Sequence, residues 1–141
     1  MKKTLSTALL AVMGATVMAQ QPAKAFKGYL FNEEYEVYMK IDFYGESISV
    51  PGNELYGLLP GFLAKRNNNF CWAVTAAKIK DENTAEMSLI NDFGSEDLTA
   101  TLTRENDSIY ILHQEKGSTL KVPKNGKWQK LPKTLPFKRQ K

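Results

Sequence analysis

Hydrophobic and polar residues alternate along most of this chain. In residues 35–44, one face of the alternating pattern is apolar and the other is mostly polar; the apolar face consists of Tyr35, Val37, Met39, Ile41 and Phe43. A period of two is typical of a β-strand with one side facing solvent, whereas the 3.6-residue period of a helix would mix the two sets. The pattern therefore predicts a strand here with one buried face.

The same alternation recurs between short turn-forming segments, and no segment has a convincing helical period. It predicts further strands near residues 26–31, 47–50, 55–59, 62–64, 70–80, 84–91, 98–103, 108–114, 118–122 and 127–131. Residues 70–80 are apolar on both faces until Lys78, which indicates a central or covered strand. Asn125-Gly126 is the sharpest hairpin signal.

The connections between these segments are too short for the crossovers that parallel pairing needs, so sequential antiparallel pairing is expected. The predicted fold is all-β. It is an antiparallel meander of about 8–10 short strands that closes into a small barrel or a strongly curved two-layer sheet, since closure removes exposed edges.

Residues 1–19 have the layout of a secretory signal. Lys2 and Lys3 precede a mostly apolar run at residues 5–12, and Val17-Met18-Ala19 places small residues at a cleavage position. The run is too short for a transmembrane span, and no cysteine at this position offers a lipid anchor. We expect a periplasmic or secreted protein, with one β-barrel-like domain at residues 20–132 and a basic tail at residues 133–141.

Charge is distributed unevenly along the chain. Residues 20–120 hold 9 Lys and Arg against 15 Asp and Glu, whereas residues 121–141 hold 8 basic residues and no acidic one. A basic segment can bind an anionic surface or a protein, fold back on an acidic body, or remain solvated. We therefore expect any protein or anionic-surface partner to bind through residues 121–141. Nucleic acid is not expected as a partner of an exported chain.

The chemistry-bearing residues are sparse. With Cys71 and His113 as the single residues of their kinds, the chain has little to build a metal site or a nucleophilic dyad. The loop at residues 91–97 offers oxygen ligands and a glycine but lacks the spacing of a twelve-residue calcium loop. We expect no catalytic residue, metal or cofactor, and therefore no enzymatic activity.

Aromatic side chains are the remaining candidates for a binding site. A barrel of about eight strands has an interior just wide enough for its own side chains or for one small ligand. We expect a small apolar or amphiphilic ligand inside the barrel, lined by aromatic candidates: Tyr29, Phe31, Tyr35, Phe43, Phe70, Trp72 and Trp128. The alternative is a protein-interaction or inhibitor module that uses the outer tyrosines Tyr38, Tyr44 and Tyr56, the loops and the basic C-terminal segment.

Four stretches together resemble the small secreted β-barrel proteins common in gut Bacteroidota. They are the signal that ends at Ala19-Gln20, the segments Phe26-Lys27-Gly28-Tyr29 and Pro60-Gly61, and the closing Trp128-Gln129-Lys130-Leu131-Pro132. The segment at residues 26–29 is also similar to the first strand of lipocalins. Asp107-Ser108-Ile109 is similar to an O-glycosylation site of that phylum. The resemblance implies a barrel with a ligand-binding interior.

Overall fold

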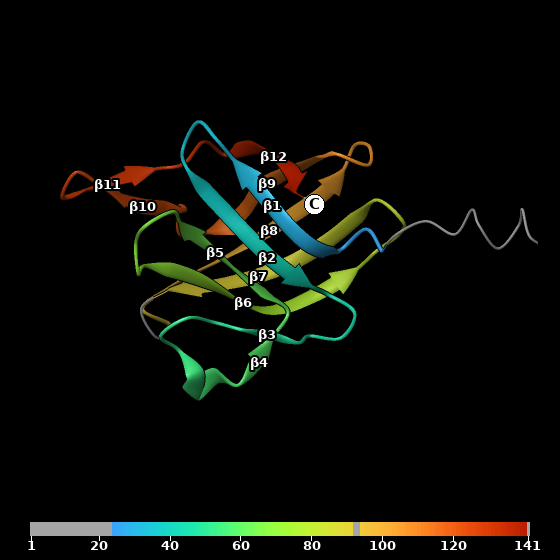
Figure 1. The fold of residues 1–141 in the computed structure, drawn as a ribbon, viewed down its shortest axis with the longest axis horizontal. Coiled ribbons are helices and arrows are strands. Elements are labelled where there is room, and N and C mark those ends of the chain that lie inside the picture. The colour runs from blue at the N-terminus through green and yellow to red at the C-terminus, as the bar shows by residue number, and fades with distance from the viewer. Residues whose placement is uncertain (1–23, 92–93, 141) are drawn as a thin grey trace, which may run out of the picture.

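The protein is an all-β closed barrel of eight antiparallel strands, as the alternation predicts (Figure 1). The computed structural model describes residues 24–91 and 94–140. The barrel strands are β1 (Lys27–Asn32), β2 (Val37–Asp42), β5 (Gly61–Lys65), β6 (Cys71–Ile79), β7 (Thr84–Asn91), β8 (Glu96–Arg104), β9 (Ile109–Gly117) and β12 (Thr134–Gln140). Each pairs with the next along the chain, and β12 closes the ring against β1.

Two insertions interrupt this meander. Between β2 and β5, the chain forms a small outer layer from β3 (Ile48–Ser49), the 3₁₀ turn η1 (Glu54–Tyr56) and β4 (Leu58–Leu59). Between β9 and β12, it forms a two-stranded hairpin from β10 (Lys121–Lys124) and β11 (Lys127–Lys130). Asn125 and Gly126 join its strands with φ of 54° and 76°, which confirms the predicted hairpin turn.

The outer layer explains why residues 70–80 are apolar on both faces. Ala73 of β6 points away from the barrel axis but is buried, because Val50 of the outer layer and Phe62 and Ala64 of β5 pack with it in a second hydrophobic cluster. The predicted covered strand is thus confirmed for the first half of β6.

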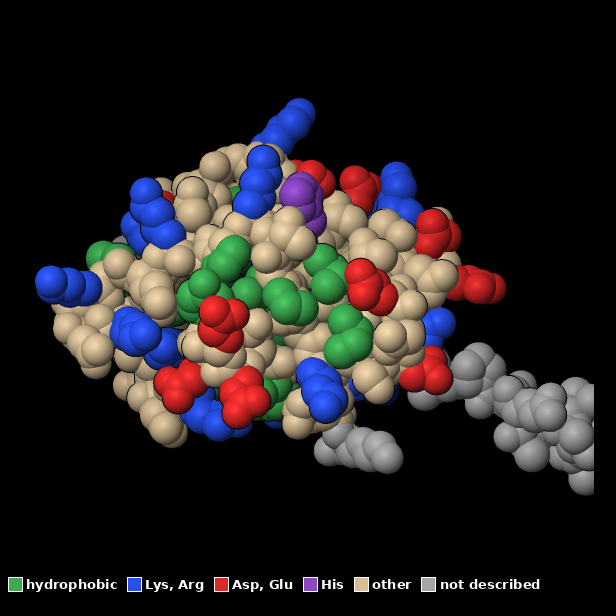
Figure 2. Space-filling model, turned by 90° about the horizontal axis from the view of Figure 1, so that it is seen from above, with side chains coloured by type: hydrophobic (Ala, Val, Ile, Leu, Met, Phe, Trp, Pro, Cys, Tyr) green, Lys and Arg blue, Asp and Glu red, His purple; other side chains and the backbone are tan. Residues whose placement is uncertain are grey.

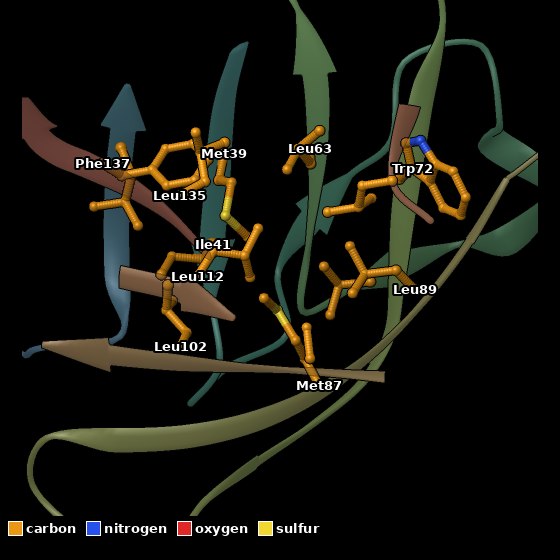
Figure 3. Packing of buried hydrophobic residues seen from close by; sticks show 14 of the residues in the cluster. Met39, Ile41, Leu63, Trp72, Met87, Leu89, Leu102, Leu112, Leu135 and Phe137 are labelled. Carbon is orange, nitrogen blue, oxygen red and sulfur yellow. The ribbon is translucent and has the colours of Figure 1, made fainter. Parts of the chain in front are cut away.

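The interior of the barrel is filled by apolar side chains. They come from all eight strands, and those labelled in Figure 3 are at most 3% exposed: Met39, Ile41, Leu63, Trp72, Met87, Leu89, Leu102, Leu112, Leu135 and Phe137. An internal cavity that could hold a water molecule would appear as accessible surface on the residues around it. The barrel axis therefore holds a packed core, as in other eight-stranded barrels whose side chains fill the interior.

The two ends of the barrel are closed by different devices. At one end, called the closed end below, Phe26 stacks on Phe43 and meets Tyr110 edge to face. At the opposite, hairpin end, Val122 of β10 and the flanking Leu120 and Leu131 are buried in the main core, so the hairpin covers the barrel there. The indole Nε1 of Trp72 donates a hydrogen bond to the carbonyl of Lys121 at 3.0 Å, which fixes the hairpin to the barrel.

The structure differs from the sequence analysis at the C-terminal end. Residues 134–140, expected within a basic tail, form β12 instead, with Leu135 and Phe137 pointing into the core. Proline at position 136 and the flanking basic residues obscured the alternation, but Pro136 still contributes its carbonyl, which accepts a hydrogen bond from Asn32 Nδ2 at 2.8 Å.

The expected signal at residues 1–19 lies outside the described residues. Among the residues that are described, no helix is long and apolar enough to cross a membrane.

Candidate functional site

The seven aromatic candidates occupy three kinds of position. Trp72 and Phe43 are buried in the core, at the hairpin end and the closed end respectively, and Tyr35 packs against the core beside the β1–β2 turn. Tyr29 and Phe31, expected in the interior, point outward, because Leu30 between them takes the inward position of β1.

The outward residues of β1 already have partners on the barrel wall. Tyr29 stacks on Tyr38 with ring centroids 5.3 Å apart, and the Arg66 guanidinium lies 4.1 Å from the centroid of Phe31. Tyr38 also meets Phe62 edge to face. These rings therefore pack on the outside of the barrel and cannot line its axis.

The last two candidates meet at the hairpin end. Phe70, in the β5–β6 loop, contacts Trp72 and Trp128 edge to face, with centroids 6.3 Å and 4.9 Å away. Trp72 is fully buried, whereas Trp128 on β11 is 56% exposed. A chain of three rings thus runs from the core to the surface, a geometry that stabilises aromatic clusters.

A pocket of about 450 Å³ opens beside Phe70 and Trp128. Its walls come from four separate parts of the chain: Gly52, Asn53, Asn69, Phe70, Cys71, Asn91, Ser95, Glu96, Lys121 and Trp128. A smaller pocket of about 230 Å³ adjoins it and shares four of these residues, Gly52, Asn69, Phe70 and Cys71. The volume of the larger pocket falls in the range of small-molecule sites.

The polar groups of the larger pocket are three amides, the Ser95 hydroxyl, the Cys71 thiol and one ion pair. Lys121 Nζ lies 2.8 Å from Glu96 Oε1 and 5.3 Å from the centroid of the Trp128 ring. Asn53 Nδ2 donates to the Cys71 thiol across 3.7 Å. The ion pair leaves the pocket without net charge, so aromatic surface and neutral amides dominate its chemistry.

The surroundings of the Cys71 thiol favour its neutral form over the thiolate. Burial raises the pKa of Cys71, and the hydrogen bond from Asn53 lowers it by a lesser amount. A thiolate, not a thiol, is the nucleophile in cysteine chemistry. His113 is not a wall residue of the pocket; its Nδ1 lies 2.8 Å from Thr134 Oγ1 on the outside of β9 and β12. The two residues do not form a nucleophilic dyad.

The remaining sequence candidates are placed as follows. Within residues 24–91 and 94–140, no three His, Cys, Asp or Glu side chains gather as metal ligands. Ser108 is exposed in the turn between β8 and β9. Of the outer tyrosines, Tyr38 and Tyr56 pack against the second hydrophobic cluster, whereas the hydroxyl of Tyr44 accepts a hydrogen bond from the Phe26 amide at 3.1 Å, at the closed end.

Sequence reasoning missed most of the pocket walls. Asn53, Asn69, Asn91 and Glu96 lie in or beside loops that look like ordinary solvated turns, and Lys121 looked like one member of a basic segment. Only the barrel closure brings these loops to one end, so no local pattern could have found them.

Fold and pocket together define a class: a small antiparallel eight-stranded β-barrel with a filled interior and an amphiphilic pocket at one end. Comparisons with protein-family models, with curated proteins and with solved structures give no match for this chain.

Proposed function

We propose that this protein is a non-catalytic binding protein that holds a small amphiphilic ligand in the pocket at the hairpin end. The observation that carries the proposal is the contact between Phe70 and the exposed ring of Trp128 at the wall of a 450 Å³ pocket. Sites for small molecules combine such apolar surface with a few polar groups that fix orientation.

Trp128 supplies the driving force in this proposal. About half of the indole is exposed, and a ligand that covers it would remove roughly 100 Å² of apolar surface from water. At about 25 cal/mol per Å², this burial favours binding by about 2.5 kcal/mol. The amides of Asn53, Asn69 and Asn91 then offer donors and acceptors to the polar part of the same ligand.

The packed core supports this end pocket over a site on the barrel axis. A ligand inside the barrel would have to displace buried side chains such as Leu63 and Leu89, each 0% exposed. Removing such side chains from a core costs several kcal/mol. The neutral thiol of Cys71 and the remote position of His113 support binding without catalysis.

The amphiphilic dye 1-anilinonaphthalene-8-sulfonate is a direct probe of the pocket. We expect saturable dye fluorescence with the wild type and roughly 50-fold weaker binding to Trp128→Ala, from the lost apolar contact. Leu55→Ala is the matched control, because Leu55 is 95% exposed and is not a wall residue. Equal affinity of both variants would contradict the proposal.

Cys71 provides a second readout in the same protein. It is the only cysteine of the chain and a wall residue of the pocket. Iodoacetamide should therefore alkylate it more slowly when the dye is bound, as measured by intact-mass spectrometry at pH 9. Native mass spectrometry of the purified protein would then search for a ligand retained from the cell.

A further inference from the structure

The β10–β11 hairpin concentrates positive charge where it projects from the barrel (Figure 1). Its eight strand residues include four lysines and no acidic residue: Lys121, Lys124, Lys127 and Lys130. Among the described residues, only Lys121 of these four has a carboxylate within salt-bridge distance, that of Glu96. Figure 2 shows Lys and Arg side chains at the end of the molecule from which the hairpin projects.

The strand register places these lysines against each other. Lys121 lies directly opposite Lys130, and Lys124 lies directly opposite Lys127. Like charges at facing positions of an antiparallel pair destabilise it. In the same hairpin, Gln129 Oε1 is buried without a hydrogen-bond partner among the described residues. A hairpin that is locally unfavourable in these ways is a candidate for a functional element.

The distribution of charge along the full sequence accentuates this contrast. Residues 20–120 carry more acidic than basic residues, whereas residues 121–141 are exclusively basic among their charged members. Four of these eight basic residues lie in the hairpin strands, so an anionic surface would attract the hairpin and repel the acidic parts of the barrel.

Trp128 lies between the lysines, on β11, and is the one strongly exposed tryptophan of the described residues. Tryptophan favours the interface between lipid headgroups and acyl chains, and neighbouring lysines bind anionic headgroups. A soluble acidic polymer would match the lysines but would provide no apolar phase for the indole.

We propose that the β10–β11 hairpin docks the protein peripherally on an anionic membrane surface. The hairpin approaches the membrane with its tip: Lys124 and Lys127 on one face and Lys130 on the other contact headgroups, and Trp128, on the same face as Lys130, enters the interfacial layer. Lys124 and Lys127 are not wall residues of the pocket, so this docking can be tested separately from the proposed ligand binding.

Co-sedimentation with vesicles tests the proposal on the full chain. Equimolar phosphatidylglycerol and phosphatidylcholine vesicles are compared with pure phosphatidylcholine vesicles at 50 mM and 500 mM NaCl. Lys124→Glu converts a like-charge facing pair into an opposite-charge pair, so the hairpin itself should become more stable. Lys40→Glu is the charge-matched control on the exposed face of β2.

We expect Lys124→Glu to bind anionic vesicles roughly 30-fold more weakly than the wild type at 50 mM NaCl, because it changes the hairpin charge by two units. Lys40→Glu should stay within about threefold, and 500 mM NaCl should abolish the difference. The segment before residue 24 is common to every variant and cancels in this comparison.

Three outcomes would overturn the docking proposal. The first is equal loss of binding in both variants, and the second is no preference of the wild type for anionic vesicles. The third is binding that depends on Lys124 but occurs only with soluble polyglutamate, which would assign the hairpin to an acidic polymer. The dye titration of the pocket is independent of all three.

Discussion

Arg139 on β12 ties the last strand of the barrel to the start of the first. Its Nη1 donates to the Ala25 carbonyl at 3.1 Å and to the Tyr110 hydroxyl at 2.7 Å, and its Nη2 donates to the carbonyls of Lys24 and Lys27 at 3.2 Å and 2.6 Å. The Tyr110 hydroxyl in turn donates to the Ala25 carbonyl. One guanidinium therefore holds the closed end together.

Replacing Arg139 with Met keeps much of the aliphatic stem and removes all four hydrogen bonds. Hydrogen bonds from a charged donor contribute about 1.5–3 kcal/mol each. The two from Nη2 are solvent-exposed, and bonds from one side chain are not additive. We therefore expect Arg139→Met to lower the free energy of unfolding by about 2–4 kcal/mol.

Urea unfolding followed by the fluorescence of the buried Trp72 measures this change, with an expected decrease of roughly 1–2 M in the midpoint. Lys138→Met is the matched control: it removes the same charge from an exposed, outward position of β12 and should cost less than about 0.5 kcal/mol. If the two variants unfolded at the same midpoint, the guanidinium would not be what holds the closed end.

Four further substitutions test other parts of the fold. Gly117→Ala should lower the free energy of unfolding by about 2–3 kcal/mol, since Gly117 has φ of 99° and an added Cβ would lie 2.8 Å from Leu98 Cα. Gly126→Ala, at φ of 76° with open space around it, should lower it by about 1 kcal/mol. Equal losses in the two variants would contradict the steric argument. Leu112→Ala should leave a cavity in the core and lower the free energy of unfolding by about 3–4 kcal/mol, as measured by thermal and urea unfolding. A loss below about 1 kcal/mol would show that the surrounding side chains fill the space that Leu112 leaves. Hydrogen bonds from Ser47 Oγ and the Gly45 amide lower the pKa of Asp42, so its stabilising effect is complete above pH 4 and is lost as the pH falls through the depressed pKa. Asp42→Asn should therefore be less stable than the wild type at pH 7, and the difference should shrink below about pH 4; a constant difference down to pH 2 would exclude the carboxylate as its source.

Much of the fold could be predicted from local patterns. The alternation of Leu98, Ala100 and Leu102 with threonines predicts the inward and outward faces of β8, and the structure confirms them. Asn125-Gly126 predicts the hairpin turn, because few other dipeptides adopt positive φ at both positions. These signals are local, so sequence alone is sufficient to find them.

The pocket and the placement of the aromatic candidates could not be predicted from local patterns. The prediction that Tyr29 and Phe31 lie inside the barrel is wrong, because the alternation around Leu30, and not aromatic character, decides which face of β1 is buried. The pocket depends on long-range contacts: Asn53, Asn69 and Trp128 line the same pocket but come from three separate parts of the chain. Spacing along a chain carries no information about such a meeting.

The ring has a consequence for the order of folding. β1 has only one partner, β2, until β12 arrives on its other side, and Tyr29 then pairs with Gln140 near the opposite end of the described chain. A nascent polypeptide still short of β12 would expose unpaired backbone on both β1 and β9. Closure of the ring must therefore wait for residues 134–140 and should be comparatively slow, since it depends on contacts between residues more than 100 positions apart. Truncation before residue 134 would leave β1 and β9 as exposed edge strands with unpaired backbone groups, which favours self-association.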